Sequence, residues 1–418
     1  MIFSLDVRRA RKGDCLLLHY GTRAQPGLVV IDGGPADVYQ PSLKPRLDAI
    51  RAARPAPGES LPLDVLMVSH IDDDHIRGIQ ELLADLVEAK EARRPLPLKI
   101  RAFWHNTFDD LIGNSPKELL AAVSASFGAA SLSGEPEVEG LDESAAKVLA
   151  SVSQGLRVRD DARKLQLRVN PQFGGRLVMA TGDAAPVAMG KGLTFTVAGP
   201  MKPELEALHA SHDAFLATRQ ERTTAALASF TDTSVPNLSS LVVMAEVKGK
   251  RMLLTGDARG DKILEGLELV GLLTPGGTVH VNVLKMPHHG SDRNMAQVFL
   301  ERIHADHYVF SGDGEHGNPE RAVMEMLRRA RPAAEYAIHL TYPLADIDAG
   351  RKEDWEKEQR KEQARKKKAP KTAVREHWSP ATHGLVAFFE AHPEMGRKVR
   401  VVPDEGAHLI ELLDPLRV

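Results

Sequence analysis

Short runs of apolar residues recur along this chain, and most of them end in a polar motif or a turn. Runs of this length that are rich in β-branched residues are typical of buried strands. Two of the runs, 241–245 and 251–254, flank a Lys-Gly-Lys turn, which favours a hairpin. The pattern predicts strands at residues 15–20, 28–31, 65–68, 99–104, 176–179, 193–197, 241–245, 251–254, 279–284, 307–310, 384–390 and 409–413.

Helical spacing of apolar residues appears between these runs. Residues 76–86 show it shortly after the strand at 65–68. The residues between them therefore lie at a strand-to-helix junction, where α/β enzymes tend to place ligand sites. Residues 109–170 predict a mainly helical insertion, and residues 203–218 predict a further helix.

The segment 351–371 consists almost entirely of charged residues. One interpretation is a solvated helix with ion pairs between residues four apart. The other is a nucleic-acid contact made by the basic cluster at 365–368. In either case we expect a charged helix and closing strands at 346–418, packed on a core formed by residues 1–345.

Composition limits the chemistry that the chain can support. The 418 residues include 43% apolar ones, enough for a sizeable core, and carry a formal charge of −3. Cys15 is the only cysteine, which excludes an intramolecular disulfide and a thiolate-rich zinc site. Any metal must therefore bind histidine and carboxylate ligands, and 17 histidines are present. A signal-peptide pattern and a long apolar run are both missing, so we expect a cytoplasmic protein.

The run Ser69-His70-Ile71-Asp72-Asp73-Asp74-His75 follows the predicted strand at 65–68. Histidines and carboxylates bind divalent ions such as zinc or manganese. Alternate residues of an extended turn point the same way, so His70, Asp72 and Asp74 can reach one cavity, while His75 turns aside as the helix starts. That arrangement suits two neighbouring metals. The alternative is a solvated acidic loop at a helix N-terminus.

Two later motifs also follow predicted strands. Asp257 ends the run Leu-Leu-Thr-Gly-Asp, and the adjacent His288 and His289 follow the strand at 279–284. A lone Gly-Asp is usually a turn. Because side chains at strand ends can converge in one cleft, these motifs complete a dinuclear set, with Asp257 as the bridge.

The combined motifs resemble those of metallo-β-lactamase-fold hydrolases, in the branch similar to the hydrolase domain of the competence protein ComEC/Rec2. The matches extend over residues 1–320, and their order along the chain agrees with that branch. The matching motifs are Lys12-Gly13-Asp14-Cys15, Ile31-Asp32-Gly33-Gly34, His70 to His75, Asn237-Leu238-Ser239-Ser240-Leu241-Val242, Leu254-Thr255-Gly256-Asp257, Lys285 to Ser291 and Gly317-Asn318-Pro319.

This resemblance implies an α/β fold, an αββα sandwich with two divalent metal ions, zinc or manganese, at the edges of the sheets. It places His70, Asp72 and Asp257 near one metal. Asp257 would also serve the other metal, together with Asp74, His75 and His288. His289 can replace His288 in this set, and the sequence does not choose between them.

The chain departs from the wider superfamily at three positions. Asp72 stands where a histidine is usual, a change that the ComEC-like branch shares. Asn237 also stands where a histidine is usual, and because Asn binds metal weakly it leaves the His70 site the weaker one. His105 is either a substitute ligand or a buried structural histidine. Relatives often have His-Pro where this chain has Asn318-Pro319, and His316 is the candidate for that role.

The implied reaction is attack of a metal-activated water on phosphorus or a carbonyl carbon. Asp74, Asp257 and His289 are the candidate catalytic residues. The candidates for substrate contact or for orienting the ligands are Asp14, Asp32, Asn237, Lys285, Ser291 and His316.

A phosphodiesterase or nuclease is the favoured activity, with DNA or another phosphodiester as substrate. The alternatives are a hydrolase of small esters, lactones or cyclic nucleotides, and a protein-binding subunit that uses the helical insertion and has a degenerate metal site.

Overall fold

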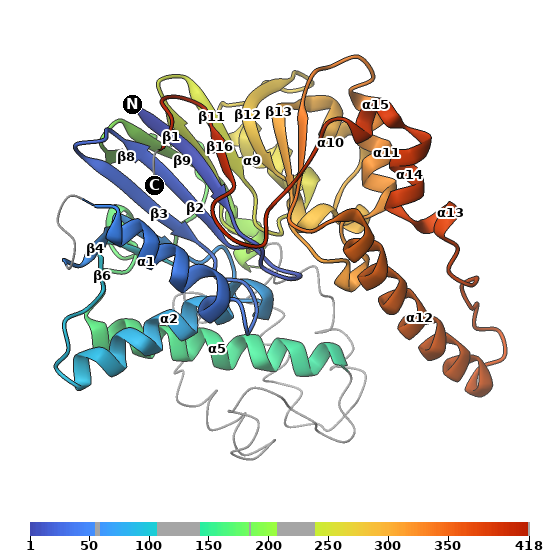
Figure 1. The fold of residues 1–418 in the computed structure, drawn as a ribbon, viewed down its shortest axis with the longest axis horizontal. Helices are drawn as coiled ribbons and strands as arrows, with labels where there is room; N and C mark the ends of the chain where they lie inside the picture. Colours follow the sequence, from blue (N-terminus) through green and yellow to red (C-terminus); the bar gives the residue numbers. More distant parts are fainter. Residues whose placement is uncertain (55–58, 107–142, 184, 207–238, 417–418) are drawn as a thin grey trace.

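The computed structural model describes residues 1–54, 59–106, 143–183, 185–206 and 239–416. Over these residues the protein is a mixed α/β structure built on two large sheets (Figure 1). The first sheet has six strands, antiparallel from β16 to β3 and parallel from β3 to β7. In spatial order these strands are β16 (Leu409–Glu411), β1 (Ile2–Val7), β2 (Leu16–Gly21), β3 (Pro26–Ile31), β5 (Val65–Met67) and β7 (Phe103–Trp104).

The second sheet has eight strands, antiparallel from β8 to β11 and parallel from β11 to β15. In spatial order they are β15 (Val399–Val401), β14 (Ala337–Leu340), β13 (Ile303–Phe310), β12 (Val279–Lys285), β11 (Lys250–Leu254), β10 (Val242–Val247), β9 (Leu193–Gly199) and β8 (Val187–Gly190). A small parallel pair, β4 (Leu61–Leu63) and β6 (Leu98–Ile100), lies beside them.

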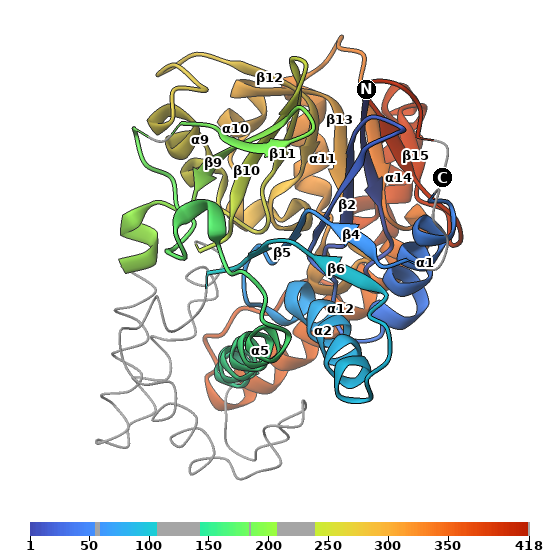
Figure 2. The same ribbon diagram turned by 90° about the vertical axis from the view of Figure 1, so that its left-hand side faces the viewer.

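The two large sheets face each other across a shared apolar core. Alternate residues of β1, such as Phe3 and Leu5, belong to the same buried cluster as Phe195 of β9 and Val243 of β10. Because side chains of a strand alternate between its two faces, the remaining residues point outward to the helices. The layers therefore run helix, sheet, sheet, helix (Figure 2).

Helices cover the outer face of each sheet. The first sheet packs against one buried cluster together with α1 (Lys44–Ala52), α2 (Asp73–Glu91) and α5 (Glu143–Leu165). The second sheet packs against α9 (Gly260–Leu269), α10 (Gln297–Arg302), α11 (Arg321–Ala330) and α14 (Leu385–Ala391).

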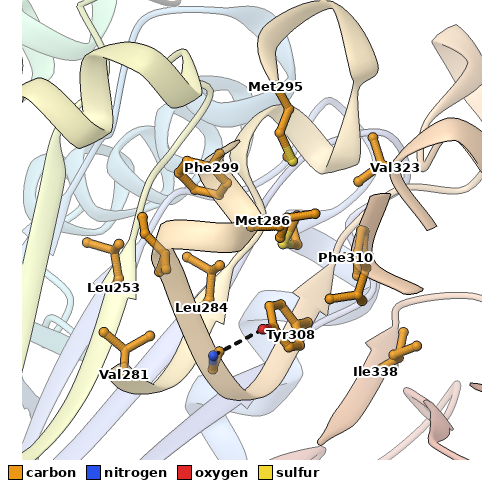
Figure 3. Close-up of a cluster of buried hydrophobic side chains, with 14 of the residues drawn as sticks. Leu253, Val281, Leu284, Met286, Met295, Phe299, Tyr308, Phe310, Val323 and Ile338 are labelled. Atoms are coloured by element: carbon orange, nitrogen blue, oxygen red, sulfur yellow. Dashed lines mark hydrogen bonds between the residues drawn. The ribbon is translucent and has the colours of Figure 1, made fainter. Parts of the chain in front are cut away.

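Figure 3 shows part of the second outer core. Leu253, Leu284 and Phe310 of the sheet belong to the same buried cluster as Phe299 of α10, and the Tyr308 hydroxyl accepts a hydrogen bond of 3.1 Å from the Ala305 amide.

The remaining helical elements are short, apart from the charged α12, which begins at Leu344 and ends at Lys368. They are η1 (Tyr39–Leu43), η3 (Pro171–Phe173), η4 (Pro287–Gly290), η5 (Asp292–Asn294), η6 (Glu315–Gly317), α13 (Pro380–His383) and α15 (Pro393–Gly396). Among the described residues, none of the helices has both the length and the apolar character that crossing a membrane requires.

Most predicted strands are confirmed, including the hairpin of β10 and β11. The predicted strand at 99–104 is in fact two strands, β6 and β7, in different sheets. The charged segment is helical, as predicted, and α5 confirms helix in the predicted insertion, of which residues 109–142 lie outside the described residues. Residues 202–206 are helical, and the rest of the helix predicted at 203–218 also lies outside them.

The strand predicted at 384–390 is wrong, because this segment forms α14. The apolar residues Leu385, Phe388 and Phe389 share the buried face of that helix. Its first turn is held by Asp348, whose carboxylate accepts hydrogen bonds from the amides of Leu385 and Val386 at 2.7 and 2.9 Å. A carboxylate at a helix N-terminus satisfies amides that lack partners within the helix.

The strand predicted at 176–179 is also wrong. The backbone there pairs with a side chain instead of a strand: the Val178 amide donates to Asn106 Oδ1 at 2.8 Å, and Asn106 Nδ2 donates to the Val178 carbonyl at 2.9 Å. One buried amide side chain thus takes the place that a neighbouring strand would fill.

Candidate metal centre

Polar side chains gather where strands of both sheets end. His70 follows β5, and Asp257 follows β11 by three residues. His289 lies in η4, directly after β12. The backbone joins these ends, since the Leu241 amide donates to the Ser69 carbonyl at 2.9 Å and the His288 amide donates to the Gly256 carbonyl at 3.2 Å. Segments far apart in the sequence thus meet at one edge.

Four side chains from three of these segments form a tight cluster. The potential ligand atoms of Asp74, His75, Asp257 and His289 all lie within 4.8 Å of one another. Asp257 Oδ1 is 3.2 Å from His75 Nε2, and its Oδ2 is 3.3 Å from His289 Nε2. Asp74 Oδ2 is 3.6 Å from His289 Nε2. Ligands about 2.0 Å from a tetrahedral zinc ion are about 3.3 Å apart, so the spacing fits a divalent cation.

Unpartnered polar atoms support the same interpretation. Within the part of the chain that the structure describes, the Nε2 atoms of His70, His75 and His289 are buried without a hydrogen-bond partner, and so is Asp257 Oδ1. A buried polar atom without a partner costs about 1–3 kcal/mol. Because all four atoms belong to residues grouped around Asp257, a shared cation accounts for them together.

A looser group of side chains shares Asp257 with the tight cluster. His70 Nε2 is 3.8 Å from Asp72 Oδ2 and 3.9 Å from Asp257 Oδ2, and His288 Nε2 is 3.7 Å from Asp257 Oδ2. Side chains here are more open to solvent, with exposed fractions of 30% for Asp72 and 26% for His288. The His70 and His75 rings are only 4.1 Å apart, so the two groups are adjacent.

Hydrogen bonds from the opposite ring nitrogens orient the three buried histidines. His75 Nδ1 donates to Asp32 at 2.8 Å. The Ser69 hydroxyl also donates to Asp32, at 2.6 Å, which leaves Ser69 Oγ to accept from His70 Nδ1 at 3.1 Å. With Nδ1 as the donor in these pairs, Nε2 is the ring nitrogen left to bind a metal ion, as is usual for ligand histidines.

His289 has an equivalent support. The Ser311 hydroxyl donates to Asp14 Oδ1, and Ser311 Oγ accepts from His289 Nδ1 at 3.1 Å. Asp14, Asp32 and His75 also offer atoms close enough to form a metal group of their own. The His75–Asp32 hydrogen bond and the contacts of Asp14 already occupy these atoms.

Lys285 is a buried cation beneath the cluster. Its side chain is 1% exposed, and its ammonium contacts Asp14 Oδ2, lies 3.6 Å from Asp257 Oδ1 and donates to the Gly256 carbonyl at 3.0 Å. Burial lowers the pKa of this ammonium, but the charges of Asp14 and Asp257 outweigh burial and raise it. Lys285 therefore remains charged and balances the carboxylates from inside the protein.

Burial and the neighbouring charges shift the pKa values of the ligand histidines in opposite directions. Burial lowers the pKa of His289, but Asp257 and Asp14 outweigh it and raise the pKa to about 10. The pKa of His75 is raised well above its usual value against burial by Asp257 and Asp32. Burial and the neighbouring His75 lower the pKa of His70 to about 3. A divalent cation must displace the protons on His75 and His289, so metal binding releases protons.

The backbone at the two adjacent histidines is strained. His288 has φ 47° and His289 has φ 55°, both in the left-handed region. Non-glycine residues held there cost about 1–3 kcal/mol each and cluster at functional sites. This turn directs the buried His289 into the tight cluster and leaves His288 at its more exposed side.

Other predicted site residues lie apart from the tight cluster. His105 is 1% exposed, and among the described residues neither of its ring nitrogens has a hydrogen-bond partner; burial lowers its pKa to about 4. Its ring stacks on Phe103 with 5.6 Å between centroids. His316 lies in η6 beside Glu315, and its side chain is 39% exposed. Ser291 is buried, and Asn237 lies outside the described residues.

Sequence reasoning missed the serines that orient the histidines. Ser69 lies within the first motif, and Ser311 directly follows β13, so position at a strand end was the available signal. A serine alone is too common at strand ends to be singled out without knowing which histidine it faces.

Comparisons with known proteins leave the family open. No family model matches the chain, and no curated protein matches it. A solved structure described as "Putative metal-dependent hydrolase from Parabacteroides distasonis ATCC 8503" is similar over 81% of this chain and 98% of its own, with 8% identity and a TM-score of 0.32. A likeness this distant supports neither a fold assignment nor a function.

Proposed function

We propose that this protein is a metal-dependent hydrolase that cleaves phosphodiesters and adopts a metallo-β-lactamase-like sandwich of the ComEC-like kind. The observation that carries the proposal is the cluster of Asp74, His75, Asp257 and His289, with its unpartnered Nε2 atoms. The layered sheets support it, because strand ends of both sheets supply the cluster.

The tight cluster is the proposed primary metal site. His70, Asp72 and His288 form a second, weaker site that shares Asp257 with it. This assignment rests on the distances around Asp257, which are 3.2 and 3.3 Å on the tight side and 3.7–3.9 Å on the other. Zinc and manganese are the proposed ions, because both accept imidazole and carboxylate ligands.

A bound divalent cation would supply Lewis-acid polarisation of a phosphoryl oxygen and a water of lowered pKa. The side chains of the site have separate roles. Asp74 is the most exposed member of the tight cluster, at 19%, so its carboxylate is placed to orient the water and accept its proton. Asp32 and Ser311 hold His75 and His289 in place.

A hydrolysis assay with matched variants tests the proposed function. The full chain, loaded with Mn²⁺ or Zn²⁺, is given bis-(p-nitrophenyl) phosphate, single-stranded DNA, double-stranded DNA and RNA. We expect His75→Ala and Asp74→Asn to lower the rate at least about 100-fold. The exposed His280 and Asp261, each outside the cluster, provide the controls His280→Ala and Asp261→Asn, which keep the wild-type rate.

Two results would contradict the proposal. Equal hydrolysis rates in the cluster variants and the wild type would show that the cluster is not the catalytic site. Metal binding without cleavage of any phosphodiester would exclude a phosphodiesterase, and hydrolysis of lactones or carboxylic esters in the same preparation would identify the alternative substrate class.

A further inference from the structure

The end of α12 and the chain that returns from it form an arm, which we define as residues 355–383. Figure 1 shows α12 leading away from the two sheets, with the return segment beside it. Three contacts hold the two parts together: Trp355 Nε1 donates to the Glu376 carbonyl at 2.8 Å, Gln359 Nε2 donates to the Arg375 carbonyl at 2.9 Å, and Arg375 pairs with Glu362 at 2.8 Å. The arm is therefore an ordered element.

The tip of the arm is strongly basic. Arg365, Lys366, Lys367 and Lys368 are consecutive and exposed, and Lys371 follows them. Within the described part of the chain, Lys366, Lys367 and Lys368 form no ion pair within 4.0 Å. Nearby acids are already paired, Glu358 with Lys361 and Glu362 with Arg375, both at 2.8 Å. The tip thus concentrates positive charge on a chain whose formal charge is −3.

Helix electrostatics explain only part of this concentration. Cations in the last turn interact favourably with the helix dipole. Like charges three or four residues apart, such as Arg365 and Lys368, repel each other and weaken the helix. A run of cations without carboxylate partners is therefore better explained by an external polyanion. The tip offers no large apolar side chain for insertion into a lipid bilayer.

A groove with an aromatic wall lies beside the same helix. It has a volume of about 450 Å³ and is lined by Lys352 and Arg360 of α12 and by His377 and Trp378 of the return segment, with Glu356 as its one acid. Two of the three tryptophans of the chain, Trp355 and Trp378, lie in the arm. Cations beside an aromatic face are the combination that binds single-stranded nucleic acid, since phosphates meet the cations and a base stacks on the ring.

The root of the arm is connected to the metal centre through η6. Arg351 Nε donates to the Gly317 carbonyl at 3.0 Å, and Glu315 of η6 pairs with Lys12 at 2.7 Å. Lys12 precedes Gly13, whose α-carbon packs so closely on the Asp74 carbonyl that a Cβ would lie 1.8 Å from its oxygen. From Arg351 to Lys368 the helix spans about 26 Å.

We propose that the arm binds the sugar-phosphate backbone of single-stranded nucleic acid, with an unpaired base stacked on Trp378, and guides the strand toward the metal centre. This proposal rests on the proposed phosphodiesterase for its last step, because only a phosphodiester-cleaving site makes the strand a substrate. The binding step stands on the arm alone.

Fluorescence anisotropy with a labelled single-stranded 20-mer tests the binding step. The full chain is compared with Lys366→Glu/Lys367→Glu and with the control Arg93→Glu/Lys99→Glu, whose exposed positions lie at the end of α2 and in β6, away from α12 in Figure 1. We expect the tip variant to bind at least about 10-fold more weakly. Its salt slope should fall by about 1.4, because each lost phosphate contact removes about 0.7. The control variant should bind as the wild type does.

Substitution of Trp378 tests the stacking. We expect Trp378→Ala to weaken binding about 5- to 150-fold and Trp378→Phe to retain most of it, because the phenyl ring still offers a stacking face. If Trp378→Ala unfolds the arm, Trp378→Phe is the deciding variant, and Trp378→Glu is the reference that lacks a stacking face. Stacking would be contradicted if Trp378→Phe keeps the wild-type far-ultraviolet circular dichroism spectrum but binds as weakly as Trp378→Glu.

The same preparations separate this proposal from the proposed function. If nucleic-acid binding depends on the tip but no phosphodiester is cleaved, the arm binds nucleic acid as proposed, and delivery of the strand to the metal centre as a substrate is contradicted. Cleavage with equal nucleic-acid affinity in tip and control variants would overturn the arm proposal. Binding of the tip to phosphatidylserine vesicles, with no binding to the 20-mer, would also overturn it.

Discussion

At the scale of single residues, Lys285 explains how so many carboxylates share a small buried volume. Its ammonium contacts Asp14 and lies 3.6 Å from Asp257, and both carboxylates are nearly fully buried. The pKa of Asp14 is lowered against burial by Lys285 and His289. A buried charge needs a partner, so Lys285 stabilises the ligand set before any metal binds.

Removal of the Lys285 charge should destabilise the protein. We expect Lys285→Met to lower the free energy of unfolding at pH 7 by about 3–5 kcal/mol, because Asp14 then stays buried without its cation. Urea denaturation measures this change. The double variant Lys285→Met/Asp14→Asn should recover part of the loss, since it removes the uncompensated charge as well. If Lys285→Met and the double variant are equally stable, Lys285 does not compensate the buried charge of Asp14.

At the scale of elements, the position of α2 is set by close backbone packing on the turn that follows β3. A Cβ on Gly78 would lie 2.0 Å from the Gly33 oxygen, and a Cβ on Gly33 would lie 2.4 Å from the Ile79 nitrogen. Gly33 directly follows Asp32, which holds His75 at the start of α2. Only glycine permits this approach, and the approach brings Asp32 and His75 together.

A methyl group at Gly78 should therefore disturb both stability and metal binding. We expect Gly78→Ala to lower the free energy of unfolding by about 1–3 kcal/mol and to weaken metal affinity, because the helix must shift away from Gly33. Urea denaturation and metal titration provide the two readouts. Gly396 lies in a helix where a Cβ would meet nothing closer than 3.4 Å, so Gly396→Ala should leave both values unchanged or raise stability slightly.

The elements also show which features a sequence can predict. Most strands and the motif from His70 to His75 are contiguous, so the local apolar pattern locates them. The helix at Leu385–Ala391 depends on Asp348, 37 residues earlier, which no local pattern reveals. The placement of His289 instead of His288 in the tight cluster depends on the left-handed turn at both residues. Pairing between distant segments, such as Lys285 with Asp14, likewise needs the folded structure.

At the scale of the whole molecule, three histidines connect the two sheets. His307 of β13 and His339 of β14 are joined by a nitrogen-to-nitrogen distance of 3.0 Å, and His339 reaches His408, beside β16, at 2.8 Å. Neutral imidazoles can form such a chain, each donating once and accepting once. Burial, with the neighbouring His408 and His307, lowers the pKa of His339 to about 3.

This chain predicts a loss of stability in mild acid. The unfolded protein takes up a proton on His339 below pH 6.5, whereas the folded protein does so only near pH 3, so unfolding gains protons as the pH falls. The contribution of His339 is complete above about pH 6.5 and is lost toward pH 3, by up to about 1.4 kcal/mol per pH unit. Urea denaturation at pH 7, 6, 5 and 4 should show a shallower decline for His339→Gln than for the wild type. Parallel curves would exclude this role.

The central claim is that Asp74, His75, Asp257 and His289 bind a divalent metal ion. Titration of the metal-stripped full chain with Zn²⁺ or Mn²⁺ tests it most directly, with the adjacent residues His289 and His288 as a matched pair of variants. We predict at least one tight site in the wild type, at least about 100-fold weaker binding in His289→Ala, and retention of that tight site in His288→Ala. Wild-type affinity in His289→Ala would contradict the account.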